Sequence, residues 1–151
     1  NVYGPGISVG SPDRGILNKV IAAALDGKPV SIFGEGDSTR DYIYIDDVID
    51  AFVYAGAHME KVNGQHYYLG TGTGHSVKEA FTLAVAQATA ASGRKADIFH
   101  VSWPDGLSEI ERRSFVADID NLRKATGWCP KVDLAEGIKR TIATFLAGGT
   151  A

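Results

Sequence analysis

A short polar segment, Phe33 to Val48, carries the residues of this chain that are best suited to ligand chemistry. Arg40 and Tyr42 are two positions apart, and residues at that spacing project from the same face of an extended strand. A guanidinium beside a phenol ring suits a phosphate with an adjoining ring or sugar, because the guanidinium presents charged donors in one plane. The pattern predicts an anion-binding strand face. The alternative is an ordinary polar face on which Arg40 forms an ion pair with Asp37 or Asp41.

Three other patterns have the residue types of known sites. Gly6-Ile-Ser-Val-Gly10 places Ser8 as in a serine hydrolase, but Pro5 and Gly6 leave no room for the strand that must precede such a nucleophile. Gly70-Thr-Gly-Thr-Gly74 is spaced like a dinucleotide-binding loop, but His75 replaces the third glycine, so a tight turn is favoured. A bound anion at the following helix N-terminus is the alternative. The four histidines share no metal-ligand spacing, so no metal is expected.

Apolar periodicity predicts helices that alternate with strands, which indicates the α/β or α+β class. The expected strands are 30–33, 40–45, 66–69 and 98–101. Helices are expected from Ile16 to Gly27 and over 118–126. Three more are expected after N-terminal caps, namely after Asp46 or Asp47, after a Ser76–Glu79 capping box and after Asp133. In the helix after Asp46 or Asp47, the stripe of Val48, Ile49, Phe52 and Val53 is expected to be buried.

Size and charge exclude several classes of protein. The 151 residues fit one domain, 1–151, and the net charge of -3 with 15 scattered Lys and Arg argues against a nucleic-acid partner. No apolar run has the length of a membrane span or a secretory signal. Cys129 is the single cysteine, which favours a reducing, cytoplasmic compartment. Because the sequence starts at Asn1 without Met, we expect a piece of a longer protein.

Several segments in a fixed order carry a family resemblance. They are Asn1-Val-Tyr-Gly-Pro-Gly6, Ile32-Phe-Gly-Glu-Gly36, Arg40-Asp-Tyr-Ile-Tyr-Ile-Asp-Asp47, Tyr68-Leu-Gly-Thr-Gly72 and Thr126-Gly-Trp-Cys-Pro130. Over almost the whole chain this resembles the C-terminal half of an extended short-chain dehydrogenase/reductase, the UDP-glucose 4-epimerase-like family of NAD-dependent nucleotide-sugar epimerases and dehydratases. The resemblance implies an α/β, Rossmann-type fold without its N-terminal dinucleotide-binding half, so that 1–151 would be a single nucleotide-sugar-binding domain.

The resemblance also implies roles for individual residues. Arg40 would bind the pyrophosphate of a UDP- or dTDP-linked sugar, with Tyr42 supporting the nucleotide and Asn1 near the sugar and diphosphate. The family's second phosphate-binding arginine lies in an R-x-G-D segment that this chain lacks, so Arg113 or Arg112 would replace it from a shifted position.

The nucleotide base has its own expected pocket in this resemblance. Ser31 and Phe33 would lie beside the pyrimidine, and Leu17 would line the same pocket. The family's Tyr-x-x-x-Lys pair and G-x-x-G-x-x-G loop are absent from this sequence, so no catalytic or cofactor-binding residue is expected here. NAD or NADP would serve the parent enzyme, and this chain alone would be inactive. Its partner would be a second copy or the missing N-terminal half, and a stand-alone nucleotide-sugar-binding module is the alternative.

Overall fold

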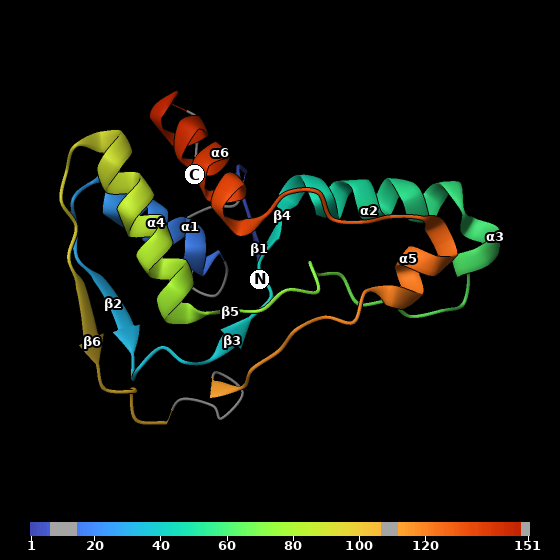
Figure 1. Cartoon of the computed structure of the whole chain (residues 1–151), viewed down its shortest axis with the longest axis horizontal. Coiled ribbons are helices and arrows are strands. Elements are labelled where there is room, and N and C mark those ends of the chain that lie inside the picture. The colour runs from blue at the N-terminus through green and yellow to red at the C-terminus, as the bar shows by residue number, and fades with distance from the viewer. Residues whose placement is uncertain (7–14, 107–111, 149–151) are drawn as a thin grey trace.

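A computed structural model describes residues 1–6, 15–106 and 112–148 of the chain. Helices and strands alternate along these residues, which confirms the α/β class (Figure 1). The strands are β1 (Val2–Tyr3), β2 (Val30–Phe33), β3 (Thr39–Arg40), β4 (Ile43–Tyr44), β5 (His75–Ser76) and β6 (Ile98–Val101). The helices are α1 (Ile16–Leu25), α2 (Ile45–Ala57), α3 (Met59–Val62), α4 (Val77–Ser92), α5 (Asp120–Thr126) and α6 (Leu134–Leu146).

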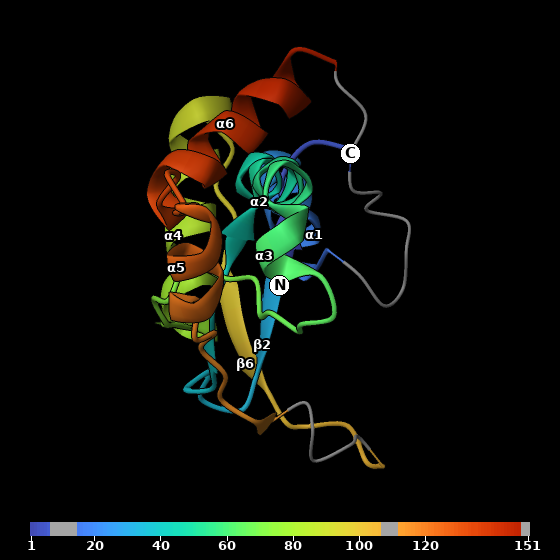
Figure 2. The same ribbon diagram turned by 90° about the vertical axis from the view of Figure 1, so that its right-hand side faces the viewer.

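Within the described ranges, the strands form three separate pairs. β1 pairs in parallel with β4, β2 in parallel with β6, and β3 in antiparallel orientation with β5. The β2–β6 pair runs in register from Val30 opposite Ile98 to Phe33 opposite Val101, and Figure 2 shows these two strands side by side. The expected strands 30–33 and 98–101 are therefore confirmed.

Two of the expected strands differ from the structure. The expected strand 40–45 is interrupted at Asp41 and Tyr42, because β3 pairs with β5 whereas β4 pairs with β1. The segment 66–69 forms no strand, since no described segment pairs with it and a strand exists only through a ladder of bonds to a partner.

Two apolar clusters hold the helices and strands together. The larger cluster joins α1, α4 and α6 to β2. In Figure 1 these helices lie together on the side of the molecule away from α3 and α5. The smaller cluster lies near α2 and α5 and consists of Ile43, Ala51, Leu122 and Trp128. Burial of such side chains supplies most of the favourable free energy of folding.

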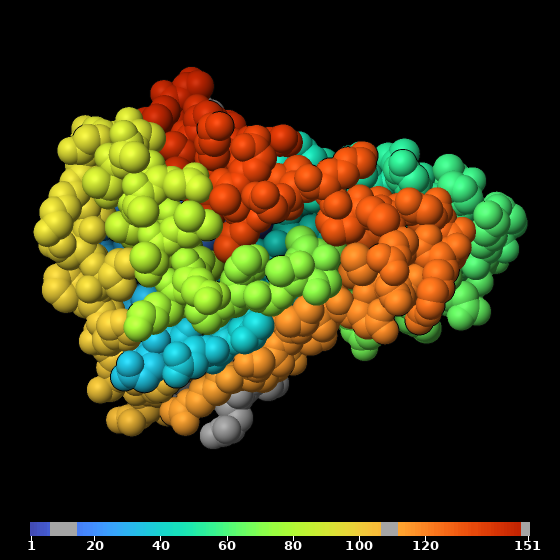
Figure 3. All heavy atoms as spheres, viewed as in Figure 1, coloured from blue at the N-terminus to red at the C-terminus, as the bar shows by residue number. Residues whose placement is uncertain are grey.

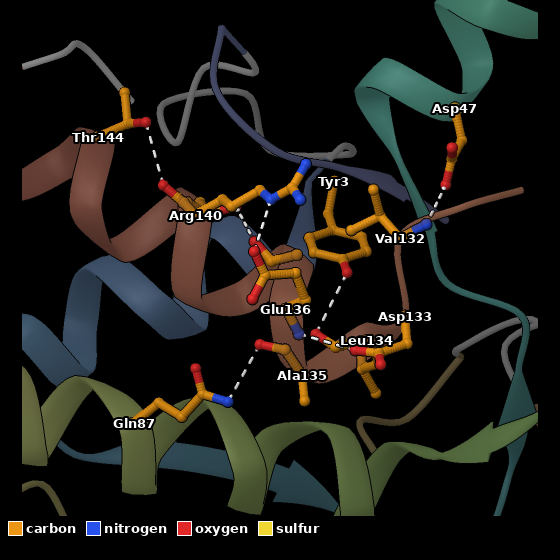
Figure 4. Close-up of polar contacts among 12 residues, drawn as sticks. Tyr3, Asp47, Gln87, Val132, Asp133, Leu134, Ala135, Glu136, Arg140 and Thr144 are labelled. Atoms are coloured by element: carbon orange, nitrogen blue, oxygen red, sulfur yellow. Dashed lines mark hydrogen bonds and ion pairs between the residues drawn. The ribbon is translucent and has the colours of Figure 1, made fainter.

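Two helices begin as their sequences predict. The Ser76 hydroxyl accepts from the Glu79 N–H at 3.1 Å, and the Glu79 carboxylate accepts from the Ser76 N–H at 2.9 Å, which is a complete capping box at α4. At α6 the Asp133 carboxylate accepts from the Glu136 N–H at 2.8 Å (Figure 4). Each side chain satisfies a backbone donor that the first turn leaves without a partner.

Asp46 and Asp47 do not have the capping role that the sequence predicted for α2. Both lie in the first turn of α2 instead. The Asp47 carboxylate is buried and accepts from the N–H groups of Lys131 and Val132, both at 3.0 Å, the latter drawn in Figure 4. Trp128 is fully buried and donates from Nε1 to the Asp47 carbonyl at 3.1 Å. This set of bonds fixes residues 128–132 against the start of α2.

One face of α2 is apolar and exposed. The stripe expected to be buried is instead largely in solvent, with exposed fractions of 53% for Ile49, 69% for Phe52 and 63% for Val53. The helix packs through its opposite side, where Ala51 is buried. Even so, none of the helices in the described part of the chain has both the length and the apolar content that crossing a membrane requires.

Because an exposed apolar stripe promotes self-association, we expect this chain to form oligomers at concentrations used for crystallisation. Substituting Phe52→Glu should shift the population toward monomer with little change in the free energy of unfolding, since the side chain makes few buried contacts. Light scattering of the variant measures this, with Thr82→Glu on the exposed side of α4 as the control. A monomeric unmodified chain would contradict the expectation.

Candidate functional site

The third strand brings Arg40 beside residues 112–115, which are distant in the sequence. The Phe115 N–H donates to the Thr39 carbonyl at 3.0 Å, and the Thr39 N–H donates to Ser114 Oγ at 3.0 Å. Arg40 and Phe115 also form an isolated parallel bridge. The segment 112–115 therefore lies alongside β3 as an irregular neighbouring strand.

This neighbourhood is visible on the surface of the molecule. In Figure 3 the blue residues 34–40 lie between the yellow-green residues 70–76 and the orange residues 112–118. Ser38 Oγ donates to the Arg112 carbonyl at 3.1 Å, which extends the contact toward the start of the orange segment. Three segments that are far apart in the sequence thus meet at β3.

The Arg40 side chain is half-buried, and its guanidinium contacts backbone carbonyls. Its Nη1 donates to the Thr39 carbonyl at 3.2 Å and to the Arg113 carbonyl. Because Arg112 and Arg113 both belong to the segment beside β3, the Arg40 side chain lies close to the backbone of two further arginines. Clustered guanidinium groups favour an anion with several oxygens. The Arg40 side chain thus contacts the Arg113 backbone, and the phosphate-binding roles expected of both side chains stay predictions.

Aromatic side chains lie next to the arginines. The rings of Phe33 and Trp103 have centroids 5.6 Å apart at an interplanar angle of 32°. The Arg112 guanidinium carbon lies 5.2 Å from the Trp103 ring centroid, within the range of a cation–π contact. Gly34 makes this close packing possible, because a Cβ there would lie 2.5 Å from Trp103 Nε1. Trp103 was not among the site residues predicted from the sequence, although it follows the expected strand 98–101.

The exposed face of the β2–β6 pair adjoins this cluster. Ser31 and Phe33 are the exposed residues of β2, and in register they lie opposite Phe99 and Val101 of β6, which are also exposed. Ser31 and Phe33 therefore share one face, as expected.

Asn1 lies close to the arginine cluster. Its carbonyl accepts from the Ile43 N–H at 3.3 Å, which places it at the start of the β1–β4 pair.

Two of the expected site residues lie in the core instead. Leu17 is 2% exposed and packs in the larger apolar cluster, so the structure does not bring it to the exposed face of β2. Tyr42 is 3% exposed, because the interruption between β3 and β4 turns it inward and away from the surface that Phe33 occupies. It lines a hollow of about 250 Å³ with Thr71, Thr73, His75 and residues 130–134.

The glycine-rich segment 70–74 forms a turn around Asp41, as the tight-turn interpretation predicted. The buried carboxylate accepts from the Thr71 N–H at 2.8 Å, from the Thr71 hydroxyl at 2.6 Å, and from the Gly72 N–H at 3.0 Å. Ala117 N–H is a fourth donor, at 3.1 Å. Gly70 leaves no space for a side chain, since a Cβ would lie 2.3 Å from Asp41 Oδ2 and 2.5 Å from the Ala117 Cβ.

A larger hollow of about 470 Å³ lies near the start of α2, away from Arg40, and is lined by Asp46, Asp47, Ile49, Asp50, Lys131, Val132 and Arg140. Its cations are paired within the chain: Lys131 Nζ lies 2.6 Å from Asp50, and Arg140 Nε lies 2.8 Å from Glu136, as drawn in Figure 4. In the described ranges no group of three His, Cys, Asp or Glu residues is placed to hold a metal ion. Ser8, the nucleophile of the hydrolase alternative, lies outside the described residues.

Known proteins are similar to this chain in sequence and in fold. Residues 1–70 match the model of the NAD dependent epimerase/dehydratase family. The UDP-glucose 4-epimerase of Mycolicibacterium smegmatis is 39% identical over 145 residues, which are 96% of this chain and 43% of that protein. A UDP-N-acetyl-alpha-D-glucosaminuronate decarboxylase of Bacillus cytotoxicus is 32% identical over 146 residues, 96% of this chain and 44% of that protein. This chain belongs to the NAD-dependent epimerase/dehydratase family.

Solved structures agree with that membership. UDP-glucose 4-epimerase from Thermotoga maritima, crystallised with UDP-glucose, matches with a TM-score of 0.82 at 32% identity. The match covers 98% of this chain and 44% of the Thermotoga chain, so this family member spans less than half the length of such relatives. Its fold is accordingly a partial Rossmann-type α/β fold.

The expectation of a C-terminal domain requires a correction. The family model matches residues 1–70 of this chain, and the matched relatives are covered over less than half of their length, so the comparisons support a partial family member and not a C-terminal domain of 151 residues. The label of C-terminal domain is therefore withdrawn.

The tight turn around Asp41 predicts the effect of glycine substitutions. Gly70→Ala should lower the free energy of unfolding by about 1–3 kcal/mol, because the new methyl group overlaps Asp41 and Ala117. Gly56→Ala is the matched control, since Gly56 lies in α2 with open space around it, and it should raise stability by about 0.5–1 kcal/mol. Urea unfolding measures both changes, and equal stability of the two variants would contradict the packing.

The buried Tyr42 predicts a loss of stability at alkaline pH. Burial raises its pKa from 10.0 to about 12, with Arg40 acting in the opposite direction. Below pH 10 the phenol is protonated in both states, whereas above it only the unfolded chain ionises, so stability falls as the pH rises toward 12. Tyr3 contributes in the same direction, because burial also raises its pKa.

Urea unfolding at pH 8 and pH 11 tests this dependence. Tyr42→Phe should lose less stability between the two pH values than the unmodified chain does, because one of the buried phenols is gone. Tyr68→Phe is the control, since Tyr68 is 66% exposed. An unchanged pH dependence in Tyr42→Phe would contradict the raised pKa.

Proposed function

We propose that this chain forms the nucleotide-sugar-binding part of an NAD(P)-dependent epimerase or dehydratase. One observation carries the proposal: β3 places Arg40 against the segment that holds Arg112 and Arg113, directly beside the aromatic pair of Phe33 and Trp103. Arginines of two neighbouring segments, next to an exposed Phe33 ring and a partly exposed Trp103 ring, match a ligand with a diphosphate at one end and a planar base at the other.

In this proposal Arg40 and Arg113 bind the diphosphate. The Arg113 carbonyl accepts from the Arg40 guanidinium, and this acceptor position is the one that a phosphate oxygen takes when the ligand binds. Charged acceptors form stronger bonds with guanidinium than a neutral carbonyl does, so the exchange favours the ligand. The Arg113 side chain is exposed and adds a second cation at the same place.

The remaining residues contact the base and the sugar. Ser31 and Phe33 border the pyrimidine from the exposed face of β2, and Asn1 is assigned to the sugar end, since its carbonyl accepts from the N–H of Ile43, three residues after Arg40. Tyr42 supports this surface from beneath, as a buried neighbour of Arg40 in the chain. We assign no ligand contact to Leu17, which is in the core.

The ligands of the relatives support a substrate class for this proposal. The Thermotoga maritima epimerase was crystallised with UDP-glucose, and a UDP-glucuronic acid 4-epimerase from Bacillus cereus, 26% identical, was crystallised with UDP-glucuronic acid and NAD. A dTDP-glucose 4,6-dehydratase from Salmonella typhimurium is 30% identical over 165 residues. A UDP- or dTDP-linked sugar is therefore the proposed ligand.

NAD or NADP belongs to the whole enzyme in this proposal, and the described residues of this chain do not fit it. The glycine-rich turn 70–74 closes around the Asp41 carboxylate, so the place that a dinucleotide pyrophosphate would need is occupied by an anion of the protein itself. None of the six tyrosines is followed by Lys at the fourth position. We propose that the chain alone binds nucleotide-sugars without transferring hydride, in a reducing, cytoplasmic setting that suits the exposed thiol of Cys129.

Calorimetric titration with UDP-glucose and dTDP-glucose tests the proposal. The unmodified chain should bind at least one of the two ligands, and Arg40→Ala should weaken that binding about 10- to 100-fold through loss of charge-assisted bonds. Arg113→Ala should weaken it by about tenfold. Lys139→Ala removes one exposed positive charge from α6, far along the chain from β3, and should leave the affinity unchanged.

Two results would refute this function. The first is a lack of heat with both ligands at millimolar concentration. The second is binding of equal strength by the unmodified chain and Arg40→Ala, which would separate the ligand from the arginine cluster.

A further inference from the structure

The Asp41 carboxylate joins three segments of the chain at one point. It follows Arg40 directly, its oxygens accept from Thr71 and Gly72 in the turn 70–74, and it accepts from the Ala117 N–H. Its side chain is buried, so these four bonds replace the water that an exposed carboxylate would have. The carboxylate therefore holds the turn and the start of the 117–120 region against the strand.

The bond to Ala117 matters because of what lies before it. The segment 112–117 is fixed to β3 at its beginning by Ser38 and Thr39 and at its end by Asp41. The positions of the arginine side chains in that segment depend on its register along β3. With its end released, the segment is held from one side only.

We propose that Asp41 is a positioning residue for the diphosphate site, acting through the segment 112–117 on Arg113 and, as chain neighbour, on Arg40. This inference rests on the proposed function of nucleotide-sugar binding. Asp41 does not contact the ligand. It sets the distance between the two guanidinium groups by fixing the backbone that carries them.

The sign of a substitution effect separates positioning from simple electrostatics. Asp41 is an anion next to a proposed anion site, so removing its charge alone would tighten the binding of a diphosphate. If Asp41 positions the arginines, removing the carboxylate weakens binding instead. Asp41→Asn keeps the size of the side chain but replaces one acceptor oxygen by a donor, which leaves a backbone N–H facing another donor.

The test is titration of Asp41→Asn with UDP-glucose, together with thermal unfolding of the same sample. We expect the variant to remain folded and its affinity to fall by about tenfold. Asp97→Asn, which removes an exposed carboxylate before β6, is the control and should bind as the unmodified chain does. Unchanged or tighter binding by folded Asp41→Asn would overturn the inference.

A double-mutant cycle identifies the route of the effect. If Asp41 acts through Arg113, then Asp41→Asn should cost less affinity in the Arg113→Ala background than alone. Fully additive losses would show that Asp41 affects binding by loosening the chain in general, which would overturn the positioning role.

A milder variant covers the case in which Asp41→Asn does not fold. Thr71→Val removes the hydroxyl donor to the carboxylate at nearly constant shape, and it should weaken UDP-glucose binding about twofold to threefold. Unchanged binding by Thr71→Val would then overturn the inference. If the unmodified chain itself does not bind, the proposed function fails, whereas a failure confined to the Asp41 and Thr71 variants removes only the positioning role.

Discussion

A carboxylate can be buried in a protein only where donors surround it, and Asp41 satisfies this condition with four hydrogen bonds. This requirement constrains the backbone on every side. The turn 70–74 must present its N–H groups inward, Gly70 must lack a side chain, and Ala117 must lie within reach. The strand β3 is therefore held by a polar centre, in a region where two-stranded pairing alone would give little stability.

A second buried carboxylate, six residues later in the sequence, also accepts backbone hydrogen bonds from a distant segment. Asp47 accepts from the N–H groups of Lys131 and Val132, while its carbonyl receives the Trp128 indole. Both aspartates come from the segment that looked like a simple strand followed by a helix cap. Asp41 directly follows β3 and Asp47 lies in the first turn of α2, so a few residues connect the 70–74 turn, the 112–117 segment and the residues 128–132.

The polar centre and the candidate site are two sides of the same strand. The Asp41 carboxylate is buried and hydrogen-bonded within the protein, whereas the Arg40 guanidinium contacts the segment with Arg112 and Arg113, and Arg112 in turn lies over Trp103 beside Phe33. Under the proposed function, the negative charge serves the architecture and the positive charges serve the ligand. The glycine-rich turn, which resembles a cofactor loop in sequence, belongs to the first of these roles because it is filled by Asp41.

Local chemistry determined much of this protein from its sequence alone. The capping box at Ser76, the cap at Asp133, the strands 30–33 and 98–101 and the turn at 70–74 follow from residues within a few positions of one another. The neighbourhood of Arg40 and Arg113 was inferred from a family resemblance, and family membership is shown by the comparisons.

The tertiary structure decided where each side chain lies and what it contacts. Tyr42 and Leu17 lie in the core, Asp47 ties a distant corner, the stripe of α2 is exposed, and Trp103 joins Phe33. Each of these outcomes depends on a partner far away in the sequence, and periodicity records only that a side chain prefers burial or water, not which segment will meet it.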